Sequence, residues 1–178
     1  ILMMTKRYPI ELIAPDIEPY RKGNTGIEFV TTFDSGIAGP HVLINAVTHG
    51  NEICGAITLD YLFRAEVQPV IGKLTFSFNN HAAYLSFDPD KPEESRYIDE
   101  DFNRLWLEER LDGKELTSEL CRARELRPLF HDVDFMLDIH SMSTNSEPLM
   151  ICHGHNKEKA FASIVNYPSY IMCGSGHI

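Results

Sequence analysis

Hydrophobic and polar positions along the chain predict strands that alternate with helices. Residues 41–47 (HVLINAV) are almost uninterruptedly apolar, as in a strand buried on both faces of a sheet. Residues 27–33 alternate and are rich in β-branched side chains, and 72–79 (GKLTFSFN) form a further strand-like run. A fourth strand is expected over 135–139 (FMLDI).

Two segments between these strands have helical spacing. Apolar residues recur at close to 3.6-residue intervals over 50–64, so a helix is expected to begin within a residue or two of His49. A second amphipathic helix is expected over 116–130. Strands that alternate with helices predict a three-layer α/β/α fold, in which a mostly parallel, mixed sheet is covered on both faces.

Two further segments lack periodic apolar residues. Residues 86–100 (SFDPDKPEESRYIDE) combine prolines with acids, which indicates a long exposed loop of the kind that is usually functional or disordered. Residues 167–178 resemble a strand followed by a loop, without the polar tapering common at a natural terminus. No repeat or linker divides the chain. We therefore interpret residues 1–178 as a single domain that is truncated on its C-terminal side.

Composition narrows the expected partners. The formal net charge of −10 argues against nucleic acid or an anionic membrane surface, because both require a basic face. No apolar run reaches the roughly 20 residues that a membrane span needs. The 4 cysteines are widely spaced, without a CxxC pair, which favours free thiols in a reducing compartment and hence a cytoplasmic location. A homo-oligomer is compatible with the sequence, which does not fix the oligomeric state.

Polar residues at two strand ends are suited to bind a metal ion. His49 and Glu52 stand three residues apart where a buried strand gives way to a helix, so one turn can aim both side chains at the same point. Open α/β sheets bind ligands outside the carboxyl ends of their strands. His140 directly follows another strand and is placed to supply the third ligand of a zinc hydrolase. Asp138, on the same side of that strand, can accept the imidazole N–H. On these residues alone, a structural role is an equally good interpretation.

A second polar cluster lies in the sequence RYIDEDFNRLW and comprises Arg96, Asp101, Asn103 and Arg104. Arginine is suited to bidentate recognition of a carboxylate and to stabilising the oxyanion that forms when water attacks an amide carbonyl. An alternative interpretation is a solvated helix start, in which the acids at 99–101 favour the helix N-terminus.

Three motifs in order carry a resemblance to a known family. His-Gly-Asn-Glu at 49–52, RYIDEDFNR at 96–104 and Asp-Ile-His-Ser at 138–141 resemble the succinylglutamate desuccinylases and aspartoacylases, relatives of the zinc carboxypeptidases. The resemblance extends over about residues 39–141. It implies a zinc-carboxypeptidase-like fold, a single zinc-hydrolase catalytic domain and one zinc ion per chain.

The resemblance also implies roles for individual residues. Arg96 would polarise the scissile carbonyl, and Asn103 and Arg104 would bind the substrate carboxylate. Asp101 would orient Arg104. The implied zinc ligands are His49, Glu52 and His140.

One family residue has no counterpart here. Enzymes of this family use a further glutamate, well beyond the third ligand, as the general base, and we expect it beyond Ile178. Glu147 and Glu158 are the acids that follow His140, and neither has a matching context. We interpret Glu147 as a loop acid before a proline.

The resemblance implies an amidohydrolase that cleaves the non-peptide carbon–nitrogen bond of a linear amide, a small anionic N-acyl amino acid. Two alternatives stay open: a zinc carboxypeptidase acting on peptides, and a metal-binding domain without catalysis, for which the missing glutamate argues. A weaker candidate metal site is formed by Cys152, His153 and His155, which lack a complete set of partner ligands.

Overall fold

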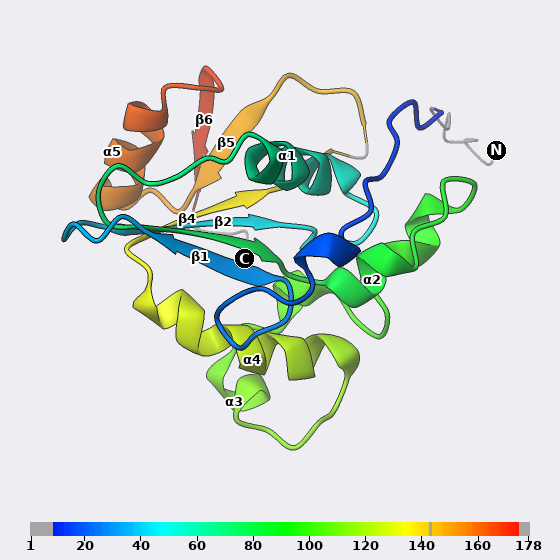
Figure 1. Cartoon of the computed structure of the whole chain (residues 1–178). Coiled ribbons are helices and arrows are strands. Elements are labelled where there is room, and N and C mark those ends of the chain that lie inside the picture. Colours follow the sequence, from blue (N-terminus) through cyan, green and yellow to red (C-terminus); the bar gives the residue numbers. More distant parts are fainter. Residues whose placement is uncertain (1–8, 143, 175–178) are drawn as a thin grey trace.

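A central sheet organises the chain in the computed structural model, which describes residues 9–142 and 144–174. Its strand order is β1–β3–β2–β4, with β2, β3 and β4 parallel and β1 antiparallel to β3 (Figure 1). The strands are β1 Val30–Asp34, β2 His41–Ala46, β3 Lys73–Phe78 and β4 Phe135–Ile139. The predicted α/β fold with a mostly parallel sheet is confirmed.

The two long predicted helices lie on opposite faces of this sheet (Figure 1). They are α1, Ile53–Arg64, and α4, Ser118–Asp132. Helix α1 begins later than the apolar spacing predicted, because the residues after β2 form a turn closed by the hydrogen bond from the Glu52 N–H to the His49 carbonyl, 3.1 Å. Helix α4 begins at the Thr117 side chain, which accepts the N–H of Leu120 as an N-cap.

Shorter elements connect and follow the sheet. A two-stranded parallel sheet, β5–β6, lies at the C-terminal side together with α5 (Figure 1). Residues 175–178 of the predicted terminal loop lie outside the described residues. No helix among the described residues is long and apolar enough to cross a membrane. The remaining elements are η1 Glu18–Tyr20, α2 His81–Leu85, η2 Pro92–Ser95, η3 Phe102–Arg104, α3 Glu108–Leu111, β5 Leu149–Cys152, α5 Asn156–Val165 and β6 Tyr170–Cys173.

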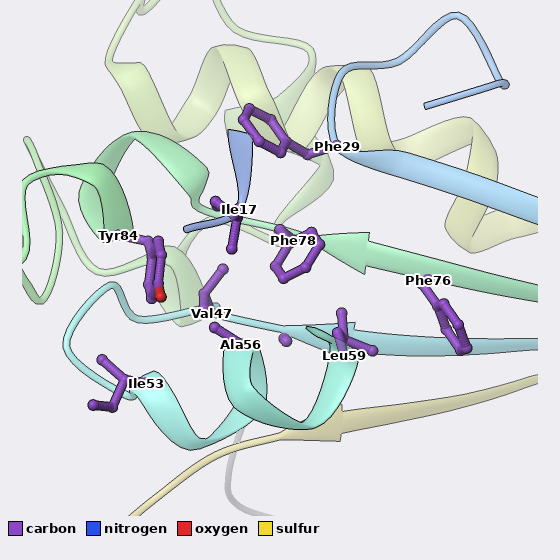
Figure 2. Packing of buried hydrophobic residues seen from close by; sticks show 10 residues of the cluster. Ile17, Phe29, Val47, Ile53, Ala56, Leu59, Phe76, Phe78 and Tyr84 are labelled. Carbon is purple, nitrogen blue, oxygen red and sulfur yellow. The ribbon is translucent and has the colours of Figure 1, made fainter. Parts of the chain in front are cut away.

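Buried side chains form two clusters. In one, Ala56 and Leu59 of α1 pack with Phe76 and Phe78 of β3 (Figure 2). In the other, Leu120, Ala123 and Leu126 of α4 pack with Phe102, Leu105 and Val30. Full burial of such apolar side chains contributes about 1.5–3 kcal/mol each. Both long helices are thereby held against the sheet. Their packing also fixes the position of the turn before α1, which carries His49 and Glu52.

A glycine lets the first turn of α1 approach the strand ends closely. A Cβ atom on Gly55 would lie 2.9 Å from the Cβ of Ala46 in β2 and 3.2 Å from the carbonyl oxygen of Ile139 in β4. The start of α1 therefore rests directly on the carboxyl ends of β2 and β4, and the polar residues of all three elements are brought together.

Candidate metal centre

The candidate ligands come from the carboxyl ends of two neighbouring strands. β2 and β4 are paired in parallel, with Ala46 opposite Ile139, so the residues that follow them leave the sheet at the same edge. Val47 follows β2 with φ 54° and is fully buried. β-branched residues rarely adopt this left-handed backbone conformation, and such strain clusters at functional sites. Here it turns the chain out of the strand and into the segment that carries Thr48 and His49.

The three predicted ligands converge. The Nδ1 atom of His49 lies 2.8 Å from Oε1 of Glu52, and the Nδ1 atom of His140 lies 2.8 Å from Oε2 of the same carboxylate. The two imidazole centroids are 5.2 Å apart. One ligand atom from each residue lies within 4.8 Å of the other two, and no other such trio of metal-binding side chains occurs among the described residues. Two imidazoles and a carboxylate form the donor set of one class of catalytic zinc sites, so the residues present fit a zinc ion.

Each histidine is held on its far side by a second carboxylate. His140 Nε2 lies 2.9 Å from Oδ2 of Asp138, as the spacing along the strand predicted, and His49 Nε2 lies 3.2 Å from Oδ1 of Asp101. A histidine that presents Nδ1 to a metal carries its proton on Nε2, and a carboxylate accepts that proton. Asp138 and Asp101 thus orient both imidazoles with Nδ1 toward Glu52.

A chain of buried polar groups extends behind Asp138. The Thr48 hydroxyl lies 2.9 and 3.0 Å from the two Asp138 oxygens and donates its hydrogen there. It accepts a hydrogen bond from Nδ2 of Asn79 at 3.2 Å, and the Asn79 Oδ1 accepts one from Ser77 at 2.8 Å. Thr48, Asn79 and Ser77 are all buried. These hydrogen bonds fix the Asp138 carboxylate from the core of the protein.

The charges in the cluster stabilise one another. Burial alone raises the pKa of Glu52, but hydrogen bonds and positive charge from His140 and His49 outweigh it and hold that pKa well below its usual value. Burial alone lowers the pKa of His140, but the Asp138 and Glu52 carboxylates raise it to about 10. The site therefore stabilises a positive charge beside an ionised Glu52, a property that suits a cation-binding site.

Arg96 is the cationic side chain at the cluster. Its Nη1 donates to Oε1 of Glu52 at 3.2 Å, and its Nη2 lies 3.5 Å from Oδ2 of Asp101. Nη2 also lies 3.0 Å from Nε2 of His49, and because that nitrogen gives its N–H to Asp101 in the arrangement above, this approach is a contact and not a hydrogen bond. The Arg96 side chain is 35% exposed, so part of the guanidinium remains accessible to a ligand.

A main-chain contact attaches residues 95–101, called the Arg96 loop, to the turn of residues 47–52 that carries His49 and Glu52. The Gly50 N–H donates to the Arg96 carbonyl oxygen at 3.1 Å. A Cβ atom on Gly50 would lie 2.3 Å from the Ser95 carbonyl oxygen and 2.3 Å from the Ala83 carbonyl carbon. Backbone atoms cannot give way as side chains do, so only glycine permits this approach.

Asn103 and Arg104 lie in η3, directly after Asp101. The Asp101 carboxylate accepts the Asn103 N–H at 2.9 Å and so caps η3. The exposed Arg104 side chain donates to the Asn103 carbonyl oxygen at 3.1 Å. Among the described contacts, the Asp101 carboxylate meets Arg96 and His49 but not the Arg104 guanidinium, because it is turned toward the cluster. The carboxylate-binding roles of Asn103 and Arg104 stay predictions.

The other sequence candidates lie away from the cluster. Glu147 is exposed, in the segment before β5. Glu158 lies 3.9 Å from His153 in a weak ion pair. Cys152 and Cys173 occupy opposite positions of β5 and β6, with their sulfur atoms 3.1 Å apart as free thiols.

Several residues of the site escaped the sequence reasoning. Thr48 and Gly50 flank His49, and only their position beside a candidate ligand marks them in the sequence. Asn79 and Ser77 end a strand that carries no ligand. Glu119 is fully buried and accepts the Ile98 N–H, and no pattern in the sequence marks it as different from other acids in the first turn of a helix.

Comparison with known proteins supports the same interpretation. A sequence model of the succinylglutamate desuccinylase/aspartoacylase catalytic domain matches residues 38–172. The chain belongs to this family. Among curated proteins, no significant match is found.

Several solved structures share the fold of this chain. Murine aminoacylase 3 is 25% identical with a TM-score of 0.57, and the match covers 75% of the present chain and 46% of that chain. An aspartoacylase family protein from Mesorhizobium loti is 22% identical with a TM-score of 0.57, covering 83% and 46%. A succinylglutamate desuccinylase/aspartoacylase from Rhodobacter sphaeroides is 23% identical with a TM-score of 0.55, covering 79% and 42%. The chain thus spans less than half the length of these three proteins.

Proposed function

We propose that this protein is a zinc-dependent amidohydrolase that cleaves a small anionic N-acyl amino acid. The observation that carries the proposal is the convergence of ligand atoms from His49, Glu52 and His140 within 4.8 Å of one another, beside the guanidinium of Arg96. Membership of the succinylglutamate desuccinylase/aspartoacylase family supports hydrolytic deacylation as the reaction class.

The three converging side chains hold one zinc ion in this proposal. When bound, such an ion polarises a carbonyl group and lowers the pKa of a bound water toward about 7. Asp101 and Asp138 keep the imidazoles oriented through their Nε2 atoms. Because these orienting carboxylates are preorganised by the protein, the ligands need little rearrangement on binding.

Arg96 stabilises the negative charge that develops on the amide carbonyl oxygen. Its guanidinium already lies beside Glu52 and His49, so an oxygen placed at the ligand cluster comes within reach of a rigid cationic donor. Fixed donors aimed at a developing oxyanion typically contribute about 10²–10³ in rate. The proton-accepting glutamate is proposed to lie beyond Ile178.

Asn103 and Arg104 bind the free carboxylate of the substrate. The protein carries a net charge of −10, so an anionic substrate depends on local arginines for its attraction. Arg104 is exposed three positions after Asp101, the residue that caps η3 and contacts His49, and it has donors left for a ligand. Residues 1–178 are proposed to form one catalytic domain, acting in the cytoplasm as the spaced free cysteines suggest.

The His49→Ala change tests the metal assignment in the full-length protein. It removes one of three ligands, and we expect loss of stoichiometric zinc together with turnover. His131→Ala, at an exposed position of α4, is the matched control and should retain both. Zinc content by atomic emission and hydrolysis of acetyl- and succinyl-amino acids are the measurements. An active His49→Ala variant without metal refutes the proposal.

The same assay separates the competing functions. Cleavage of short peptides in preference to N-acyl amino acids would assign a zinc carboxypeptidase. Full zinc occupancy without hydrolysis of either class would assign a metal-binding domain without catalysis.

A further inference from the structure

Glu119, the second residue of α4, is a buried carboxylate outside the metal cluster. Its exposed fraction is 0%. Four neutral N–H groups donate to it. Oε1 accepts the Ile98 N–H at 2.6 Å and Nδ2 of Asn80 at 3.1 Å, while Oε2 accepts the N–H groups of Asp99 at 3.0 Å and Glu100 at 3.4 Å. A buried carboxylate is tolerated when several donors surround it, and three of these belong to consecutive residues of one loop.

The same loop also accepts hydrogen bonds from residues at the beginning of α4. The Asp99 carboxylate accepts the Ser118 N–H at 2.7 Å, and the Glu100 carboxylate accepts the Thr117 hydroxyl hydrogen at 2.6 Å. The orphan N–H groups of a helix N-terminus favour such negative charges. The loop and the helix are therefore joined reciprocally, with acceptors on both sides.

We call the hydrogen bonds between residues 98–100 and the start of α4 the clasp. The residues that it holds lie, along the chain, between two residues whose side chains contact the metal cluster. Arg96 is two residues before Ile98, and Asp101 directly follows Glu100. Both side chains contact His49, through Nη2 of Arg96 at 3.0 Å and Oδ1 of Asp101 at 3.2 Å. Among the described residues, the N–H groups of Ile98, Asp99 and Glu100 each donate to Glu119, which thus binds all three backbone donors of this segment.

We propose that Glu119 is a positioning residue, which fixes the 96–101 loop so that Asp101 and Arg96 meet His49. It does not touch the cluster and acts through the backbone of residues 98–100. The effect on metal binding and turnover rests on the proposed zinc-dependent function, whereas the effect on the loop does not.

Glu119→Gln tests the clasp with little change of volume. The glutamine oxygen still accepts hydrogen bonds, but its NH₂ group meets N–H donors in place of an acceptor. We expect the amides of residues 98–100 to exchange hydrogen at least about tenfold faster, with the β2 and β3 amides unchanged. Glu125→Gln, the same change at a half-exposed position of α4, is the control and should leave loop exchange unchanged. Exchange is measured by mass spectrometry on metal-free protein.

Zinc affinity then shows whether Glu119 acts through Asp101. Removal of a group that orients a ligand typically weakens metal binding 10–100-fold, so about tenfold is expected for Glu119→Gln and for Asp101→Asn. If Glu119 acts through Asp101, the double variant binds zinc no more weakly than Asp101→Asn alone. Competition with a chromophoric chelator measures these affinities.

Three outcomes decide the proposal. Unchanged loop exchange in Glu119→Gln overturns it, as do additive losses of zinc affinity in the double variant. If Glu119→Gln does not fold, Asp99→Asn, which weakens the clasp from the exposed loop side, must accelerate exchange at 98–100, or the proposal fails. If Glu119→Gln accelerates loop exchange but the parent protein hydrolyses no N-acyl amino acid, the proposed function is contradicted, whereas the positioning role of Glu119 is still supported.

Discussion

At the scale of single residues, the candidate site depends on side chains that the metal ligands do not touch. Thr48 is the clearest case: its hydroxyl donates to Asp138, which in turn holds Nε2 of His140. Thr48 is 2% exposed and accepts from Asn79. The orientation of His140 therefore depends on a chain of three hydrogen bonds, which leads through Asp138 and Thr48 to Asn79.

Replacement of Thr48 by valine should weaken zinc binding. Valine preserves the branched shape but removes the hydrogen bond from residue 48 to the Asp138 carboxylate, and outer partners of metal ligands are worth about 10–100-fold in affinity. We expect a loss of about tenfold, measured by chelator competition. Thr48→Ser retains the hydroxyl and should stay within a few-fold of the parent protein. Equal affinities for the valine and serine variants would contradict this role.

His81 gives a pH dependence that is separate from the cluster. Its ring stacks on Phe29 with centroids 4.5 Å apart, and its buried Nδ1 has no hydrogen-bond partner among the described residues. Burial, with a smaller contribution from the charge of Arg122, lowers its pKa from 6.5 to about 4. Between these values the unfolded chain binds the proton and the folded chain does not, so stability is lost as pH falls from 6.5 toward 4.

The His81→Gln variant isolates this contribution. It cannot titrate in this range, so its free energy of unfolding should fall less steeply between pH 7 and 4.5. The difference should be about 2 kcal/mol or less after allowance for partial exposure. Urea unfolding at several pH values provides the measurement, with the exposed His131→Gln as control. Parallel pH profiles for the parent and His81→Gln would disprove the assignment.

The sequence indicated the candidate ligands and Asp138, but not the residues behind them. His49, Glu52 and His140 follow strands, and Asp138 follows from the period of two along β4. Thr48, Asn79 and Glu119 act on partners up to dozens of residues away, and no local pattern indicates such pairings. Their roles emerge only once the strands and α4 are packed.

At the scale of elements, parallel pairing explains why the prediction of strands succeeded. β2 and β4 are neighbours, so residues that follow both reach the same edge of the sheet. The apolar runs predicted these strands because both faces are covered by helices. The loop of residues 86–100 was harder, because its order comes from η2 and from contacts with α2 and α4 rather than from its own composition.

The contact between the ligand turn and this loop yields a prediction for Gly50→Ala. The added Cβ meets backbone atoms of Ala83 and Ser95 at 2.3 Å, so the loop must move away from the turn. Overpacking of this kind destabilises by about 1–3 kcal/mol. We expect such a loss in the free energy of unfolding, together with lower turnover as Arg96 moves.

Chemical denaturation and steady-state kinetics measure both effects. The control is Gly174→Ala, whose added Cβ would meet no atom of the described residues within 4 Å, its chain neighbours aside. Unchanged stability in Gly50→Ala would show that the loop adapts without strain.

At the scale of the whole molecule, the proposed zinc site predicts that zinc stabilises the folded chain, because its candidate carboxylate ligand is buried. Glu52 is 7% exposed, and a bound cation compensates its charge only in the folded chain. At a zinc concentration 1,000 times the dissociation constant, binding stabilises by about 4 kcal/mol. For a domain of this size, the unfolding temperature should rise by roughly 10 °C.

Thermal unfolding with zinc and with a chelator measures this shift. Glu52→Gln, which removes the charged ligand at nearly constant volume, should lose most of it. An equal zinc-dependent rise in both proteins would indicate that zinc binds elsewhere.

The attachment of the Arg96 loop through backbone hydrogen bonds has a consequence for divergence. The candidate metal ligands follow two adjacent strands, whereas the proposed substrate contacts lie on a segment attached near them through Gly50 and Glu119. Exchange of residues 86–95 for another sequence would leave all of these tie points in place. The scaffold therefore separates the candidate metal ligands from residues 86–95, which can be exchanged for another sequence. Grafting of other loops at 86–95 tests this separation.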